Sequence, residues 1–395
     1  MISYNRGLIG GSMRYLLTEE QKMIVDICRQ IVAERIVPVR AELDESGTFP
    51  REIIDEIGKS DLFRIFIPEE YEGMGTGIFE VCLATEELSR GDLSVATSYA
   101  ASGLGLIPIL VAGSQEQKKK FLPGLASGSK LAAFGLTEAE AGSDAGGIRT
   151  NAKKDGDFYI LNGTKQWITN GGEADIYTIF AMTNPSKGVR GASAIIVEKG
   201  TPGFEFGKKE DKLGIRASAT RELIFTDCKV PKENLLGSEG MGFIIAMKTF
   251  DQSRPAVGAQ AVGVAQGALE EALNYSKIRK QFGAAISSFQ AVQHMLADME
   301  TNVEAARALV YHAARVIDSG EKNVTRLASM AKLFASDMAM KVTVDAVQIL
   351  GGYGFMKEYP VEKMMRDAKI TQIYEGTNQI MRNIIALDMI KRGVL

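Results

Sequence analysis

An acidic residue in an apolar setting near the carboxyl end is the first candidate for chemistry. Glu375 lies in the stretch KITQIYEGTNQI (369–380), beside Tyr374 and close to Ile373 and Ile380. Burial disfavours the charged form of a carboxyl group, so a partly desolvated glutamate binds a proton more tightly, which suits a general base. An ordinary loop glutamate is the alternative, because Gly376 lets the chain bend there.

Other loops carry residue types that could hold a ligand. LTEAEAGSDAGG (136–147) supplies small residues and backbone donors that could cradle an anion or a heterocycle, although it could equally be a glycine-rich turn. KQWITNGG (165–172) contains the single tryptophan, Trp167, for which a place in the core is the alternative. FDQSRP (250–255) places Asp251 and Arg254 at what we expect to be a helix interruption, where Asp251 could cap the next turn.

Several common catalytic arrangements find no support in the sequence. The chain has two histidines, His294 and His312, and both lie in one predicted helix, where a helix-face position is the expected role. A histidine-based triad or a multi-histidine metal site is therefore not expected. The G-x-S-x-G, Walker and G-x-G-x-x-G patterns are missing as well, so the sequence does not predict a Rossmann-type nucleotide site.

The composition indicates a soluble protein of a reducing compartment. Of the 395 residues 45% are hydrophobic, and 46 basic and 49 acidic residues are mixed along the chain, with no basic stripe of the kind that binds nucleic acid. The three cysteines are far apart, and we find no apolar run long enough for membrane insertion. We expect a cytoplasmic protein, or a matrix protein if the source has mitochondria. Met13 is a candidate native start.

The elements that must position these residues fall into three parts. Residues 13–131 read as helices, among them one opened by a Thr18–Gln21 capping box and others at 51–59 and 80–90. Residues 132–241 contain short β-rich runs separated by glycine-rich turns, which predicts an antiparallel sheet. Residues 242–395 return to long helices.

Two long apolar seams define the last part. One runs at helical spacing from Val292 to Ile317, and the other from Val324 through Phe334 to Ile349, ending at two glycines. Such seams predict a helical bundle. A shorter helix from Pro360 to about Lys369 and a last helix capped by Thr377 would then enclose the loop that holds Glu375.

The motifs taken together resemble the flavin-dependent acyl-CoA dehydrogenases. LTEAEAGSD, QWITNGG, RKQFG, DAVQILGGYGF, EYPVEKMMRDAKI and IYEGTNQI occur in that family's order and spacing, and the resemblance covers the chain after Met13. It implies an α+β fold with an N-terminal helical domain (13–131), a middle antiparallel β domain (132–241) and a C-terminal four-helix bundle (242–395). It also implies a homotetramer, a dimer of dimers, that binds FAD.

The resemblance assigns roles residue by residue. Glu375 would remove the α-proton of an acyl thioester, whose carbonyl would be polarised by the Glu375 N–H and a flavin hydroxyl. Residues with an implied role in FAD binding are Phe134, Leu136, Thr137, Gly142, Ser143, Trp167, Ile168, Thr169, Arg279, Phe282, Gln290, Gln348, Gly351, Gly352, Thr377, Asn378 and Gln379. Residues with an implied role in substrate binding are Ser143, Asp251, Arg254, Gln260, Thr371, Tyr374 and Gly376.

Two positions depart from the pattern or leave it open. The family usually has Pro-Gly where this chain has Ala139–Glu140, so the loop carries an added charge. Asp92 is either the N-cap of the following helix or a second carboxylate near the acyl pocket, which could act on a cyclic acyl group.

The implied reaction is α,β-dehydrogenation of an acyl-CoA in β-oxidation, with electrons passed to an electron-transferring flavoprotein. Gln260 and Thr371 resemble the pair that shortens the pocket in the short-chain branch, and Tyr99 could narrow it further. No arginine lies between Asp92 and Lys118 to clamp a dicarboxylic acyl group. A short linear acyl group is predicted. The alternatives are a small branched or alicyclic acyl group, the reverse enoyl-CoA reductase reaction, an acyl-CoA oxidase and a non-catalytic assembly partner.

Overall fold

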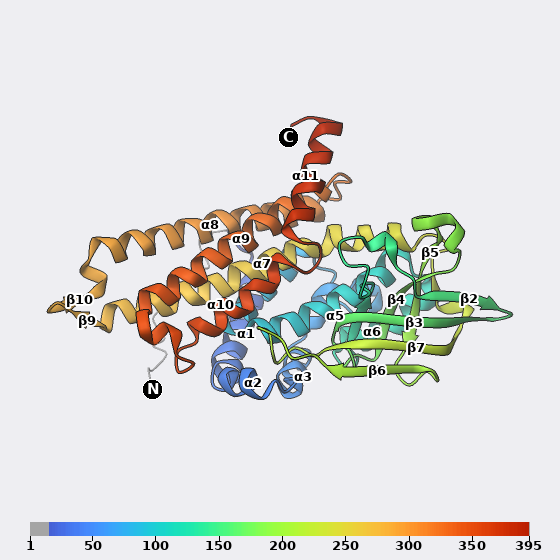
Figure 1. The fold of residues 1–395 in the computed structure, drawn as a ribbon, viewed down its shortest axis with the longest axis horizontal. Coiled ribbons are helices and arrows are strands. Elements are labelled where there is room, and N and C mark those ends of the chain that lie inside the picture. Colours follow the sequence, from blue (N-terminus) through green and yellow to red (C-terminus); the bar gives the residue numbers. More distant parts are fainter. Residues whose placement is uncertain (1–15, 395) are drawn as a thin grey trace.

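A computed structural model describes residues 16–394, so the prediction for Met13 lies outside the described residues. The chain forms a first group of helices, then a sheet, then a second group of helices (Figure 1). The sheet lies at one end of an elongated molecule, and the long helices of the second group extend away from it. The predicted α+β class is confirmed.

The first group contains α1 to α6. Its helices are α1 (Glu19–Ile31), α2 (Arg40–Ser46), α3 (Arg51–Lys59), α4 (Ile78–Gly91), α5 (Leu93–Ala112) and α6 (Gln115–Ala126). The predicted capping box is present: the Thr18 N–H donates to Gln21 Oε1 at 3.0 Å, and the Gln21 N–H donates to Thr18 Oγ1 at 3.3 Å. These two bonds satisfy amides that the first helical turn leaves without partners.

Helix α5 corrects one expectation from the sequence. It is long and apolar enough to cross a membrane by length and composition, and 72% of its most apolar window is buried inside the fold. It packs against α4, α7 and β1. A helix that is apolar all round is what a position between two other layers requires, because each of its faces contacts protein.

The sheet is mixed rather than antiparallel. Its strands are β1 (Ala132–Gly135), β2 (Asn151–Asp155), β3 (Phe158–Thr169), β4 (Ile176–Met182), β5 (Ala192–Glu198), β6 (Phe204–Lys209), β7 (Thr220–Pro231) and β8 (Leu235–Leu236). Their order is β6-β7-β3-β2-β4-β5-β8, and β1 pairs with β4. The β1–β4 and β2–β4 pairs are parallel, because the chain leaves β1 and returns through the β2–β3 hairpin before it forms β4.

The second group is built on one very long helix. Its helices are α7 (Gly242–Ile278), α8 (Gln290–Asp318), α9 (Thr325–Leu350), α10 (Val361–Ala368) and α11 (Asn378–Arg392), with a small hairpin of β9 (Lys280–Gln281) and β10 (Ala284–Ala285). The helices α7, α8 and α9 lie side by side, and α11 projects from the body (Figure 1).

The interruption expected at FDQSRP is wrong. Helix α7 runs for 37 residues and includes Pro255 in its interior. A proline there removes one backbone hydrogen bond and crowds the carbonyl four residues earlier. Packing along α4, α5, α8 and α9 offsets that cost. Asp251 is accordingly not a cap: its carboxylate accepts a hydrogen bond from Thr325 Oγ1 at 2.7 Å, in α9.

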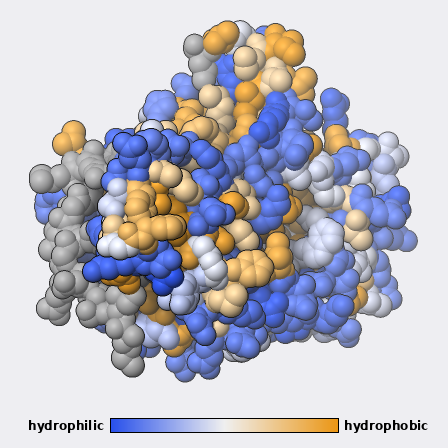
Figure 2. Space-filling view, turned by 60° about the vertical axis from the view of Figure 1, so that its left-hand side comes forward, coloured by the Kyte–Doolittle hydropathy of each residue, from blue (hydrophilic) through white to orange (hydrophobic). Residues whose placement is uncertain are grey.

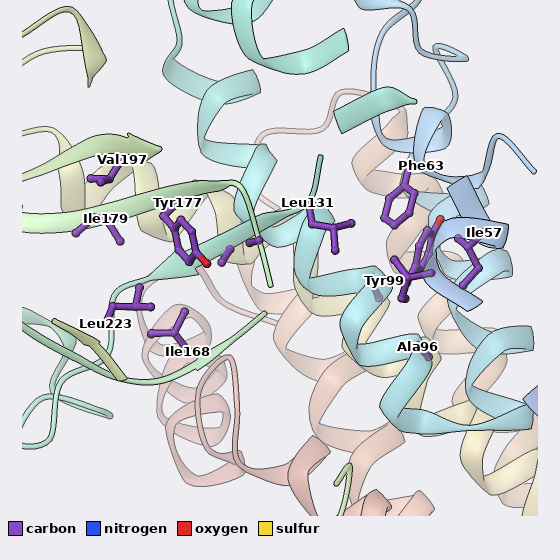
Figure 3. Close-up of a cluster of buried hydrophobic side chains, with 14 of the residues drawn as sticks. Ile57, Phe63, Ala96, Tyr99, Leu131, Ile168, Tyr177, Ile179, Val197 and Leu223 are labelled. Carbon is purple, nitrogen blue, oxygen red and sulfur yellow. The ribbon is translucent and has the colours of Figure 1, made fainter. Parts of the chain in front are cut away.

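The core is continuous between the helices and the sheet. Figure 3 shows Ile57, Phe63 and Tyr99 on the helical side, and Tyr177 and Val197 on the sheet side, of one buried cluster. The predicted seams of α8 and α9 form a second cluster around α7. Phe334 is an exception, since 40% of it is exposed. Both histidines lie on the exposed face of α8, as predicted.

Candidate active site

A large cavity lies where the three parts of the described chain meet. It has a volume of about 780 Å³ and is bounded by α5, the loop after β1, the end of β3, one face of α7 and the turn before α11. The structure brings these predicted residues to its wall: Phe134, Leu136, Thr137, Gly142, Ser143, Trp167, Ile168, Thr169, Arg254, Gln260, Tyr374, Glu375 and Gly376. An apolar cavity with a few converging polar groups is typical of a ligand site.

The turn that holds Glu375 has an unusual backbone. Glu375 has φ +52°, in the left-handed region that costs a residue with a side chain about 1–2 kcal/mol. The next residue, Gly376, has φ +98°, which glycine adopts without that cost. Thr377 then caps α11 as predicted, accepting from the Ile380 N–H at 3.3 Å. The turn aims the Glu375 carboxylate into the cavity.

The carboxylate of Glu375 has one close partner. Ser253 Oγ, on α7, donates to Glu375 Oε2 at 2.5 Å. Burial raises the pKa of Glu375, and the Ser253 hydrogen bond and the charges of Arg254 and Lys332 oppose that rise. The net direction is upward, so this carboxyl binds a proton more tightly than an ordinary glutamate and is better suited to act as a base.

A backbone donor lies at the same place. Among the hydrogen bonds of residues 16–394, none uses the Glu375 N–H as donor, whereas the amides of Ile373 and Tyr374 both donate to the Ile370 carbonyl. An unused N–H next to a base is what the polarisation of a substrate carbonyl requires, because charge that develops on that oxygen then meets a donor already in place.

The wall of the cavity carries a short chain of hydrogen-bonded polar side chains. Tyr374 Oη donates to Gln260 Oε1 at 2.5 Å, and Gln260 Nε2 donates to Thr97 Oγ1 at 3.4 Å. All three residues line the cavity, and Gln260 is buried. The Gln260 amide is thus held on both sides and presents a fixed polar group to the cavity.

Two residues predicted to shape the pocket have other surroundings. Thr371 is buried, and its hydroxyl donates to the Ala368 carbonyl at 2.7 Å rather than lining the cavity. Tyr99 donates to the Leu62 carbonyl at 2.9 Å, and its ring packs on Phe66 at 5.1 Å between centroids. Phe66 lines the cavity, so Tyr99 supports the wall from behind.

The loop after β1 is held by a buried ion pair that sequence reasoning missed. Lys165 is fully buried, and its ammonium donates to Glu138 Oε1 at 2.6 Å and to the Leu136 carbonyl at 3.1 Å. Glu138 also accepts from the Arg149 and Thr150 amides. The exchange of Pro-Gly for Ala139–Glu140 adds a charge that Arg149 meets at 2.9 Å.

Trp167 is not a core residue. It is 58% exposed, has φ +56° and lines the cavity beside Thr169. The alternative that placed the single tryptophan in the core is therefore wrong, and its ring is available to cover a bound ligand.

A second cluster of predicted residues forms a separate cavity of about 540 Å³ at the hairpin end of the long helices. Arg279, Gly351 and Gly352 line it, and the Arg279 guanidinium lies 5.3 Å from the Tyr353 ring centroid. Phe282, Gln290 and Gln348 are exposed nearby in the chain. Within one chain this group is not joined to the Glu375 cavity, because it lies at the opposite end of α7.

The remaining predicted site residues do not line the large cavity. Asn378 is buried and bonded to Lys332, Ser336 and Asp337, and Gln379 is exposed. Asp251 lies 3.7 Å from Arg254, which does line the cavity.

Asp92 is the N-cap of α5. Its carboxylate accepts from the Ser94 and Val95 amides at 2.7 and 3.1 Å. The same carboxylate lies 2.6 Å from the buried ammonium of Lys363, which also contacts Asp367 at 2.5 Å. The N-cap interpretation is confirmed, and the residue is not among those that line the cavity.

Sequence comparison shows the family to which the chain belongs. Residues 18–129, 133–228 and 240–390 match the family profiles described as acyl-CoA dehydrogenase N-terminal, middle and C-terminal domains. The chain belongs to the acyl-CoA dehydrogenase family. Acyl-CoA dehydrogenases are FAD-dependent oxidoreductases, and the resemblance read from the sequence motifs is confirmed.

Relatives with similar sequences span nearly the whole chain. The short-chain-specific acyl-CoA dehydrogenase of Clostridium acetobutylicum is 48% identical over 95% of this chain and 99% of its own. The butyryl-CoA dehydrogenase of Megasphaera elsdenii superposes with a TM-score of 0.93 at 47% identity, over 96% of this chain and all of its own. A chain in a structure of the electron transferring flavoprotein of Acidaminococcus fermentans superposes with a TM-score of 0.94 at 52% identity, over 96% of this chain and all of its own.

Proposed function

We propose that this acyl-CoA dehydrogenase converts a short-chain acyl-CoA to the trans-2-enoyl-CoA and passes the electrons to an electron-transferring flavoprotein. The observation that carries the proposal is the position of the Glu375 carboxylate, in an apolar cavity that the Gln260 amide also lines. The relatives named short-chain-specific and butyryl-CoA dehydrogenase support the same choice of substrate.

Glu375 acts as the base. A thioester α-carbon is a weak acid in water, so the proton affinities of base and substrate must be brought together. Burial raises that of Glu375, and the unused Glu375 N–H lowers that of the substrate by bonding to the thioester oxygen. The α-proton passes to a carboxylate oxygen of Glu375, and Ser253 orients that carboxylate.

The residues around the cavity fit FAD. Phe134, Leu136, Ile168 and the exposed Trp167 provide flat apolar walls for a ring system, and the loop at Gly142 has open space at the position of a Cβ. FAD bound there would supply the acceptor for the β-hydrogen, which leaves as a hydride. The buried Lys165–Glu138 pair holds the backbone of Leu136 next to Thr137, whose carbonyl accepts from the Gln166 N–H at 2.8 Å.

The acyl group is short because Gln260 ends the apolar space. A longer chain would press methylenes against the amide and would forfeit about 0.8 kcal/mol for each methylene left unburied. Displacing the amide would also break its hydrogen bonds to Tyr374 and Thr97, at about 1 kcal/mol each.

The assembly proposed is a homotetramer in which the Arg279 cluster of one subunit completes the FAD site of another. Two observations support an assembly. The Arg279 cavity lies apart from the Glu375 cavity in the single chain. Figure 2 shows apolar residues on the projecting α11, where Leu387 and Ile390 are 66% and 83% exposed. We propose a cytoplasmic location on the composition of the chain.

The proposal is tested with purified flavoprotein and a series of acyl-CoAs. Bleaching of the flavin spectrum and kcat/KM are measured for butyryl-, hexanoyl-, octanoyl-, cyclohexanecarboxyl- and glutaryl-CoA, with electron-transferring flavoprotein as acceptor. We expect butyryl-CoA to give the highest kcat/KM. A maximum at octanoyl-CoA or at glutaryl-CoA would overturn the substrate assignment.

A further inference from the structure

We propose that Lys332 is a positioning residue for the base: from inside α9 it holds the backbone of the Glu375 turn and so fixes where the carboxylate lies. The inference rests on the proposed role of Glu375. Lys332 lies outside the motifs that carry the family resemblance.

The contacts of Lys332 are directed at the turn. Its ammonium donates to the Gly376 carbonyl at 2.8 Å and to Asn378 Oδ1 at 2.8 Å. One residue earlier, Arg254 Nε donates to the Glu375 carbonyl at 3.4 Å. Two buried cations on different helices thus hold two successive carbonyls of the turn.

These hydrogen bonds support a backbone conformation that is unfavourable on its own. Glu375 and Gly376 both have positive φ, and a residue with a side chain keeps that conformation only when its surroundings impose it. Asn378 extends the hold into α11, because its Nδ2 donates to Ser336 Oγ at 2.9 Å and to Asp337 Oδ1 at 2.7 Å. The start of α11 is thereby tied to α9.

A solvated lysine would serve poorly, and Lys332 is not solvated. It is fully buried, and burial lowers its pKa to about 7, with Glu375 and Asp337 favouring the charged form and Arg254 opposing it. Of the other charged groups in this network, Asp251 lies against Arg254 at 3.7 Å and Arg382 against Asp337 at 2.7 Å. A buried ammonium is retained where its hydrogen bonds are used.

The test uses three variants of the full-length FAD-loaded protein. Lys332→Met removes the charge and the donors, Lys332→Gln removes the charge but keeps a donor, and Lys341→Met is the control, an exposed lysine on the same helix. Two quantities are measured: hydrogen exchange of the amides in segment 373–378, and the rate of flavin bleaching by butyryl-CoA from pH 5 to 8.

For Lys332→Met we expect faster exchange in 373–378 and bleaching slowed about tenfold or more, since small misplacement of a reacting group is costly. Loss of the nearby positive charge also raises the proton affinity of Glu375, so the acid limb of the pH profile moves to higher pH. Lys332→Gln should show the shifted limb with exchange close to the parent. A lysine that only stabilises the fold would lower the melting temperature without speeding exchange in 373–378 more than in the rest of the chain.

Each result has one meaning. Exchange and pH profiles of both Lys332 variants equal to those of Lys341→Met would overturn the inference. If Lys332→Met does not fold, Lys332→Ala is measured in its place, and exchange in 373–378 equal to that of the parent overturns the inference. If the parent protein fails to bleach while Lys332→Met still loosens segment 373–378, the proposed function fails and the hold on the turn stands.

Discussion

Replacing Gln260 by alanine should lengthen the acyl group that the enzyme prefers. The side chain removed is roughly as long as two methylenes, so a hexanoyl chain can bury two more carbons than a butyryl chain in the same slot. At about 0.8 kcal/mol per methylene this amounts to about 1.6 kcal/mol, or about a 15-fold rise in the ratio of kcat/KM for hexanoyl-CoA over butyryl-CoA. The hydrogen bonds that Tyr374 and Thr97 lose affect both substrates equally and cancel in the ratio.

The assay is steady-state turnover with both substrates, for the parent enzyme, Gln260→Ala and Thr371→Ala. Thr371→Ala is the matched control because its hydroxyl bonds to the Ala368 carbonyl and the residue does not line the cavity. We expect it to leave the ratio within about twofold of the parent. An unchanged ratio in Gln260→Ala, or a shift of equal size in Thr371→Ala, would refute the assignment of Gln260 as the end of the slot.

Three further outcomes are expected. Glu375→Gln should keep FAD bound and the fold intact but abolish flavin bleaching, and bleaching at the parent rate would exclude Glu375 as the base. In the parent, the bleaching rate should fall as the pH drops through the raised pKa of Glu375, so that the acid limb lies above the ordinary glutamate range. Arg279→Ala should lose FAD and oligomer together on dilution, seen by size-exclusion chromatography at 450 nm; a fully flavinated, stable oligomer would contradict this. Asp92→Asn should keep the N-cap and the activity. It should lower the free energy of unfolding in urea by about 1–3 kcal/mol, because Lys363 loses one of its two carboxylate partners. Loss of turnover at unchanged stability would contradict this prediction.

Local patterns predicted much of the architecture. The capping box at Thr18, the cap at Thr377 and the seams of α8 and α9 follow from nearby residues along the chain. The structure has all of them apart from the exposed Phe334. The helix interruption predicted at FDQSRP was wrong because distant contacts, and not local pattern, decide the structure there. Its proline locally disfavours helix, and only contacts with four other helices, far away in sequence, keep α7 continuous.

The site was predictable in its motif residues and not in what supports them. Glu375 stood out as an acid among apolar neighbours. Ser253 and Lys332 carry no such signal, because a serine and a lysine in helical stretches usually face solvent, and their roles appear only when two helices meet the turn. The parallel pairing of β1 with β4 could not be predicted for a similar reason, since the sequence of a short apolar strand does not indicate the direction of the strand it pairs with.

Because α7 is unbroken, a single rigid helix fixes the distance between the Glu375 carboxylate and the proposed end of the pocket. Ser253, which bonds to the proposed base, and Gln260, which we propose ends the slot, are seven residues apart, so they share a face about 10 Å apart along the axis. Along that helix, the position of the pocket end can change in steps of one helical turn, about 5.4 Å. Chain-length preference can therefore be redesigned, or diversify among gene duplicates, by edits on one helix that leave the proton-transfer chemistry untouched.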